Sequence, residues 1–145
     1  MALISSTHLP VATLREHFKQ WAKASLEKEQ GVPEDYYART GRYRFFIMVD
    51  QEAMESVLSA AEDDYETGFV RMFNAEWTLK GPCEEDIVNG DVPQPEEPLE
   101  ECTEKDVGWM KVCWGYVEPP GFHKLRDWED WEAYYARPPE IADIP

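Results

Sequence analysis

The sequence predicts an α+β fold in which a small mixed or antiparallel sheet of three to four strands packs against helices. The chain has 145 residues, of which 43% are hydrophobic and 13% aromatic, and this size and composition are typical of one domain with one core. Helical and strand patterns follow each other in the order α-β-α-β-β-α. We therefore treat residues 1–145 as a single domain.

An amphipathic helix is predicted over residues 10–30. Its apolar residues recur at spacings of three and four; they are Val11, Leu14, Phe18, Trp21, Ala22 and Leu26. Thr13 and Glu16 suggest a capping box, Pro10 offers an alternative first turn, and Gly31 followed by Pro33 ends the helix. The exposed face is expected to carry Arg15, Lys19, Lys23 and Lys28.

The next two elements are a strand and a second helix. Residues 42–49 alternate in the way a strand requires, and Asp50 is placed to cap the helix that follows. The buried stripe of this helix is expected to contain Ala53, Met54, Val57, Leu58 and Ala61.

Two further strands, at residues 68–77 and 107–117, are apolar on both faces. Such strands lie centrally in a covered sheet, or have one face that receives a partner or ligand. We expect a right-handed parallel crossover from the first strand to the second, an antiparallel pairing of the second with the third, and helices on one face of the sheet. A ferredoxin-like variant would have this arrangement.

The C-terminal region is predicted to contain a short aromatic helix at residues 127–137, capped by Asp127 and ended by Pro138 and Pro139. Residues 138–145 form an extended tail. No fourth strand is evident from the pattern, so either a weak strand is hidden in a loop or another chain completes the sheet.

Charge is distributed unevenly along the chain. The net charge is −16, but residues 1–45 carry seven basic and five acidic residues, so the rest of the chain has −18. This acidity disfavours direct nucleic-acid binding. The apolar runs are too short to span a bilayer and the start lacks a signal-peptide pattern, so we expect no membrane association and a cytoplasmic, or else nuclear, protein.

The loop at residues 81–106 contains ten acidic residues, one lysine, four prolines and no aromatic residue. A segment of this composition buries too little apolar surface to offset its ordering entropy, which predicts a mobile loop. Together with the acidic end of the second helix it supplies the expected partner-binding residues, Glu62, Asp63, Asp64, Glu84, Glu85, Asp86, Glu96, Glu97, Glu100 and Glu101.

Recognisable catalytic and metal-binding motifs are absent from the sequence, which contains no P-loop, nucleophile elbow, GxGxxG, HExxH or EF-hand pattern. Cys83, Cys102 and Cys113 have neither CxxC spacing nor an even count, so we expect reduced thiols, no metal and no cofactor. His123 is a weak candidate for a catalytic base, and whether the protein is an enzyme stays open.

Arg71 and Lys111 interrupt aromatic strand faces and, with Trp77 and Trp109, form a candidate ligand-binding set. A cation beside aromatic walls suits a small anionic ligand. The competing interpretation is that these cations pair with neighbouring carboxylates or pack along their stems.

Three functions follow from these patterns. The leading hypothesis is a non-enzymatic protein–protein interaction module that recognises a basic protein surface through the acidic loop. The alternative is a small ligand-binding protein or enzyme with an aromatic pocket and a cationic anchor. A nucleic-acid mimic ranks last, because mimicry needs charges on regular structure. An open sheet edge also makes a homodimer a candidate state.

Overall fold

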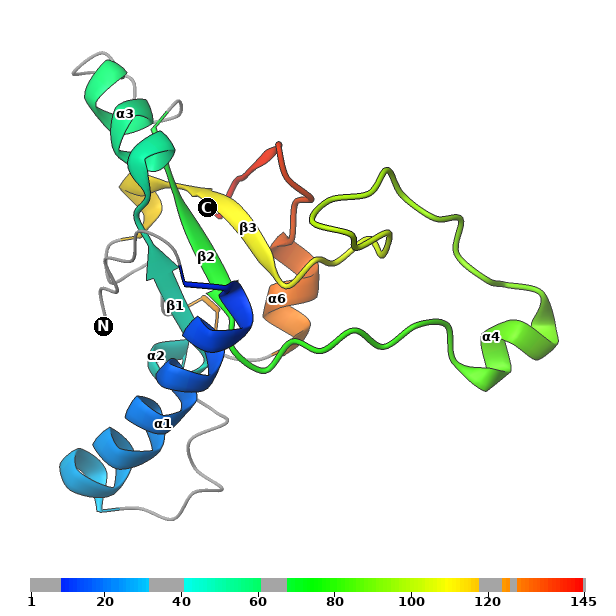
Figure 1. The fold of residues 1–145 in the computed structure, drawn as a ribbon, viewed down its shortest axis with the longest axis horizontal. Coiled ribbons are helices and arrows are strands. Elements are labelled where there is room, and N and C mark those ends of the chain that lie inside the picture. Colours follow the sequence, from blue (N-terminus) through cyan, green and yellow to red (C-terminus); the bar gives the residue numbers. More distant parts are fainter. Residues whose placement is uncertain (1–8, 32–40, 61–67, 118–123, 126–127, 145) are drawn as a thin grey trace.

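The computed structural model describes residues 9–31, 41–60, 68–117, 124–125 and 128–144. Its elements, in chain order, are α1 (Val11–Gln30), α2 (Gly41–Arg44), β1 (Phe45–Met48), α3 (Gln51–Ser59), β2 (Phe69–Asn74), α4 (Glu84–Asn89), β3 (Trp109–Cys113), the 3₁₀ turn η2 (Trp114–Tyr116), α6 (Trp128–Tyr134) and β4 (Ile141–Ala142). The predicted α+β class with a small mixed sheet is confirmed (Figure 1). None of the described helices is long and apolar enough to cross a membrane.

The four strands lie in the order β1-β2-β3-β4. β2 and β3 are antiparallel, as predicted, and Arg71 lies opposite Lys111. The predicted parallel crossover from β1 to β2 is wrong, because these strands are antiparallel, with Ile47 opposite Met72. α3 extends beyond one end of the sheet instead of running back along it (Figure 1), so the chain re-enters at the end it left. β1, α3 and β2 therefore do not form the parallel unit of a ferredoxin-like variant.

Helices cover both faces of the sheet, which corrects the expectation of one covered face. On one face α1 packs its buried residues against Phe46, Phe73 and Trp109. On the other, Trp131 of α6 and Ile144 of the tail pack with the opposite side chains of the strands. The two central strands are buried on both faces, as their sequence predicts.

α1 confirms the predicted helix but not its capping box. Its N-cap is Pro10, without a side-chain hydrogen bond, and it ends at Gly31, whose φ of 59° is the left-handed conformation of a helix C-cap. Leu14, Phe18, Ala22 and Leu26 are buried, as predicted. Arg15 does not lie on the exposed face: its guanidinium is partly buried against the β2 and β3 ends.

α3 begins as predicted, because Asp50 Oδ1 accepts a hydrogen bond from the Ala53 amide at 2.9 Å. The predicted apolar stripe is confirmed only in part: Ala53 is buried and Val57 is half-buried, but Met54 is 51% and Leu58 is 79% exposed. Ser56, which is not part of the predicted stripe, joins the helix to β2: its Oγ accepts from the Phe69 amide at 3.0 Å and donates to Ala53 O at 2.6 Å. Ala61 lies outside the described residues.

All three predicted strands are shorter in the structure: the prediction at residues 68–77 contains β2 (Phe69–Asn74), and that at residues 107–117 contains β3 (Trp109–Cys113) followed by η2 (Trp114–Tyr116). Residues 41–44 form a helical turn before β1, which shortens the predicted first strand to Phe45–Met48. The tail is extended, as predicted, and contains the fourth strand: β4 pairs parallel with β3, where Ala142 lies opposite Val112. Of the two explanations for the missing strand, the hidden weak strand is therefore the one observed.

Candidate functional site

The segment between β2 and β3 projects away from the sheet as a long arm that carries α4 near its far end (Figure 1). We call residues 81–106 the acidic arm. α4 starts at Cys83, whose Sγ accepts from the Asp86 amide while the Asp86 side chain accepts from the Cys83 amide. α4 buries none of its residues. Its Ile87 is 58% and its Val88 is 84% exposed, so the arm offers apolar as well as acidic groups.

The predicted partner-binding residues fall into two groups. Seven of them are described and lie on the acidic arm; all are exposed except Asp86, which is intermediate. No described lysine or arginine forms an ion pair with these seven carboxylates. Glu62, Asp63 and Asp64 lie outside the described residues.

The returning half of the arm forms a tight hairpin. Leu99 and Cys102 exchange two backbone hydrogen bonds of 3.0 and 2.9 Å, and the Glu96 amide donates to Thr103 O at 2.8 Å. We call residues 96–103 the acidic hairpin. Its two central residues, Glu100 and Glu101, have φ values of 51° and 69°, which is the geometry of a type I′ turn.

Arg137, just after α6, holds this hairpin from the body of the protein. Its Nη2 donates to Glu97 O at 2.6 Å and to Cys102 O at 3.2 Å. Its Nη1 donates to Glu104 O, and to Lys105 O at 3.3 Å. All four acceptors are main-chain carbonyls, so the guanidinium leaves the glutamate side chains free.

α6 also holds the segment through which the acidic arm enters β3. We call this segment, residues 106–108, the root of the arm. Trp131 Nε1 donates to Asp106 Oδ2 at 2.9 Å, and Asp106 Oδ1 accepts from the Gly108 amide at 2.7 Å. The Val107 amide donates to Tyr135 Oη at 3.0 Å. Burial raises the pKa of Tyr135 to about 12. The chain therefore enters β3 from a point held by two aromatic side chains.

Arg15 braces the same root from the other face of the sheet. Its Nε donates to Asn74 O and its Nη2 donates to Gly108 O, both at 3.1 Å. The guanidinium carbon lies 5.0 Å from the centroid of the Trp77 ring, a cation–π contact. Burial lowers the pKa of Arg15, and the negative charges of Asp106 and Glu100 act in the opposite direction.

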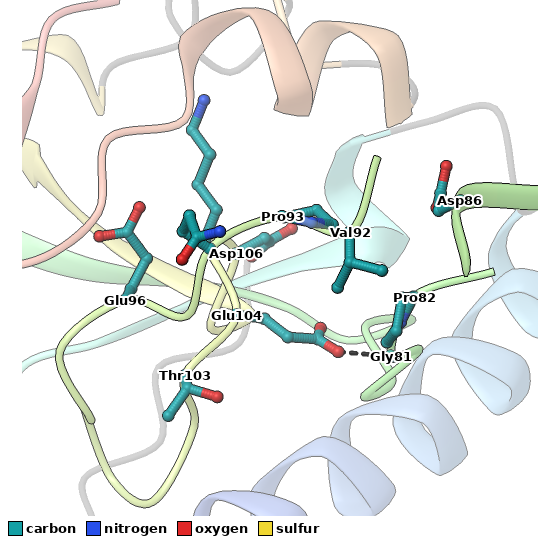
Figure 2. A pocket seen from close by; sticks show the side chains of 11 residues that line it. Gly81, Pro82, Asp86, Val92, Pro93, Glu96, Thr103, Glu104 and Asp106 are labelled. Carbon is teal, nitrogen blue, oxygen red and sulfur yellow. Dashed lines mark hydrogen bonds between the residues drawn. The ribbon is translucent and has the colours of Figure 1, made fainter. Parts of the chain in front are cut away.

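A hollow of about 480 Å³ lies between the outgoing and returning parts of the acidic arm (Figure 2). Figure 2 shows Glu104 reaching across it toward Gly81, whose amide donates to Glu104 Oε1. Glu96, Asp106 and Lys105 also line the hollow, beside Pro82, Val92 and Pro93. A smaller hollow of about 240 Å³ shares Glu104 and Asp106, so these two carboxylates face two concave surfaces.

Of the predicted ligand-binding residues, the structure brings three together. The guanidinium carbon of Arg71 lies 4.8 Å from the centroid of the Trp109 ring, and Lys111 Nζ lies 4.1 Å from the Phe69 ring centroid. Trp77 lies apart, against Arg15. The grouping of Arg71, Trp109 and Lys111 on one sheet face follows from their register in β2 and β3.

Carboxylates at the start of α3 neutralise both of these strand cations. Arg71 Nε lies 2.7 Å from Asp50 Oδ2, and its Nη2 contacts Glu52. Lys111 Nζ lies 2.9 Å from Glu52 Oε1. The Arg71 and Lys111 side chains are only 14% and 12% exposed. The geometry matches the competing interpretation, in which these cations pair with neighbouring carboxylates, better than it matches a free anchor for an anion.

The remaining candidates are His123, a possible metal site and the three cysteines. His123 lies outside the described residues. The described part of the chain contains no group of three or more His, Cys, Asp or Glu side chains placed to hold a metal ion. Cys83 is exposed, Cys102 is intermediate and Cys113 is buried, and all three are free thiols.

Comparison with protein-family models, with curated proteins and with solved structures finds no match for this chain.

Sequence reasoning missed the two arginines that organise this region. Arg137 precedes a Pro-Pro pair in what reads as a helix end, and Arg15 reads as a solvent-facing helix residue. A partial signal was available for Arg15: it lies one position from the buried Leu14 in α1, at the border of the apolar stripe, where a long side chain reaches neighbouring elements.

The pKa of Tyr135 gives a testable pH dependence. A folded-state pKa of about 12, above the usual value of about 10, means that the folded state retains the proton longer than the unfolded state. The stabilising contribution is complete below pH 10 and is lost as the pH rises from 10 to 12. Because Tyr135 is partly exposed, we expect a loss of about 1–2 kcal/mol after discounting solvent screening.

Urea unfolding of the native protein and of Tyr135→Phe between pH 9 and 12 measures this loss. The native protein should lose more stability than the variant across the interval, and a tyrosinate absorbance titration should lack one late-titrating group in the variant. Equal pH profiles would contradict the assignment.

Proposed function

We propose that this protein is a non-enzymatic protein–protein interaction module whose acidic arm recognises a basic protein surface. The observation that carries the proposal is the projecting arm, on which six of the seven described candidate carboxylates are exposed and none is paired with a described lysine or arginine. Unpaired like charges on one projection attract a cationic partner over a distance.

The anchoring of the arm supports the same proposal. Arg137, Trp131 and Tyr135 hold its returning half through main-chain atoms and Asp106, and the exposed glutamates of the acidic hairpin keep both of their oxygens for a partner. A returning half that these contacts hold in one conformation loses less entropy on binding than a disordered one. Predicted mobility of the acidic arm, the homodimer and the cytoplasmic location stay predictions.

The test is a charge-neutralising variant with four substitutions, Glu96→Gln, Glu97→Gln, Glu100→Gln and Glu101→Gln. The probe is a synthetic octalysine peptide, titrated by calorimetry at about 20 mM salt, where charges are weakly screened. If each of the four exposed pairs contributes about 0.2–1 kcal/mol, the variant should bind between about fourfold and about a thousandfold more weakly.

The matched control neutralises four exposed glutamates outside the arm, Glu27→Gln, Glu55→Gln, Glu129→Gln and Glu140→Gln. The two variants have the same net charge, so a general charge effect would weaken both equally. The proposal requires the arm variant to lose clearly more affinity than the control, and the difference to shrink at about 200 mM salt. Equal losses would count decisively against it.

A further inference from the structure

The acidic hairpin contains an uncommon backbone conformation. Glu100 and Glu101 both have positive φ, 51° and 69°, in the two-residue turn between Leu99 and Cys102. A type I′ turn normally carries Asn-Gly, because those residues tolerate positive φ. Glutamate has no such tolerance, and non-glycine residues in this region persist only where the surroundings impose it. Contacts from outside the turn must therefore offset its strain.

Arg137 supplies contacts of that kind on both sides of the turn. It donates to Glu97 O before the turn, to Cys102 O at the end of the turn, and to Glu104 O and Lys105 O after it. The planar guanidinium carries five N–H donors in a rigid fork, and here that fork joins the outgoing and returning strands of the hairpin. Lysine could not reproduce this geometry, because its ammonium is a single point of donation.

Within the described residues, the carboxylates of the acidic hairpin stay unpaired because Arg137 donates only to main-chain carbonyls. Arg137 lies against the main chain of the hairpin, and every one of its acceptors is a main-chain carbonyl. The side chains of Glu96, Glu97, Glu100 and Glu101 are all exposed. An arginine that only balanced the charge of the arm would contact their carboxylates instead.

We infer that Arg137 is the positioning residue of the acidic arm: it holds the strained Glu100–Glu101 turn closed and so keeps the glutamates of the hairpin displayed. The consequence for affinity rests on the proposed function, whereas the consequence for the hairpin itself does not. Loss of Arg137 opens the hairpin while the sheet and its two cores stay intact.

Hydrogen exchange tests the structural part. In Arg137→Gln, the amides of Glu96, Leu99 and Cys102, which are the donors inside the hairpin, should exchange about tenfold faster or more. The β2 amides should change less than twofold. The matched control is Arg42→Gln, which removes the same charge from an exposed arginine paired with Glu29. Unchanged exchange in the hairpin, or an equal increase throughout the sheet, would overturn the inference.

A second-site rescue separates positioning from general stabilisation. Glu100→Asn with Glu101→Gly provides a turn that adopts positive φ without help. Added to Arg137→Gln, it should restore most of the lost protection at Leu99 and Cys102. If protection is not restored, Arg137 does not act by offsetting the strain of the turn, and the inference fails.

Octalysine binding tests the consequence for affinity. Arg137→Gln should bind the peptide about threefold or more weakly than the native protein through faster dissociation, although removal of a positive charge favours cation binding. Arg42→Gln should not weaken binding. If the native protein does not bind octalysine, the proposed function fails while the exchange experiment still decides the structural part. If Arg137→Gln opens the hairpin but still binds octalysine normally, the conformation of the hairpin does not determine the affinity, and that part of the inference is wrong.

Discussion

Replacing Gly108 by alanine should lower the free energy of unfolding by about 2–5 kcal/mol. Gly108 has a φ of +80°, and a Cβ there would lie 2.5 Å from Arg15 Nη2 and 2.5 Å from Trp77 Cδ2. A left-handed alanine costs about 1–2 kcal/mol, and forced overpacking adds about 1–3 kcal/mol. The clash also displaces the guanidinium that donates to Gly108 O and Asn74 O.

Gly31→Ala is the matched control for this experiment. Gly31 has a φ of +59°, but a Cβ there would meet nothing within 4 Å, so only the conformational cost of about 1 kcal/mol remains. Urea unfolding followed by far-ultraviolet circular dichroism measures both variants. A Gly108 variant no less stable than the Gly31 variant would show that Arg15 and Trp77 do not pack against the root of the arm.

The second large effect is expected for Trp131→Ala, with a loss of about 3–5 kcal/mol. Trp131 is 2% exposed and stacks on Phe45 with ring centroids 5.3 Å apart. Truncation leaves a large cavity under the sheet and removes the donor to Asp106 Oδ2. Tyr116→Ala, at an aromatic residue that is 38% exposed, should cost less than about 1 kcal/mol.

Trp131→Phe separates packing from the hydrogen bond. Phenylalanine keeps most of the ring contact but cannot donate to Asp106, so we expect a smaller loss of about 1–3 kcal/mol. Hydrogen exchange at the Gly108 amide, whose acceptor is Asp106 Oδ1, should rise in both Trp131 variants. Full stability of Trp131→Ala in urea would contradict the burial of this side chain.

Local pattern identified most of the regular elements correctly. Apolar spacing located α1, alternation located β2 and β3 as strands buried on both faces, and Asp50 was recognised as a helix cap. These features depend on short-range periodicity and on one side chain bonding to a nearby amide. They are therefore readable from the order of residues alone.

The errors arose where a partner distant in sequence decides the outcome. Met54 and Leu58 were predicted to be buried but are exposed; α3 contacts β2 through Ser56, whose Oγ accepts from the Phe69 amide 13 positions away. The orientation of β2 relative to β1 depends on the path of the chain around α3. Local apolar spacing carries no information about either feature.

For the candidate site, the sequence alone determined that residues 81–106 carry a net charge of −9 and too few apolar residues to form a core of their own. Only the tertiary structure decided that this segment is an arm rooted on α6 and Arg15, with a turn held by Arg137. Composition is a local property, whereas the contacts that hold the arm join residues 25 to 93 positions apart. Such contacts exist only after the sheet has brought those residues together.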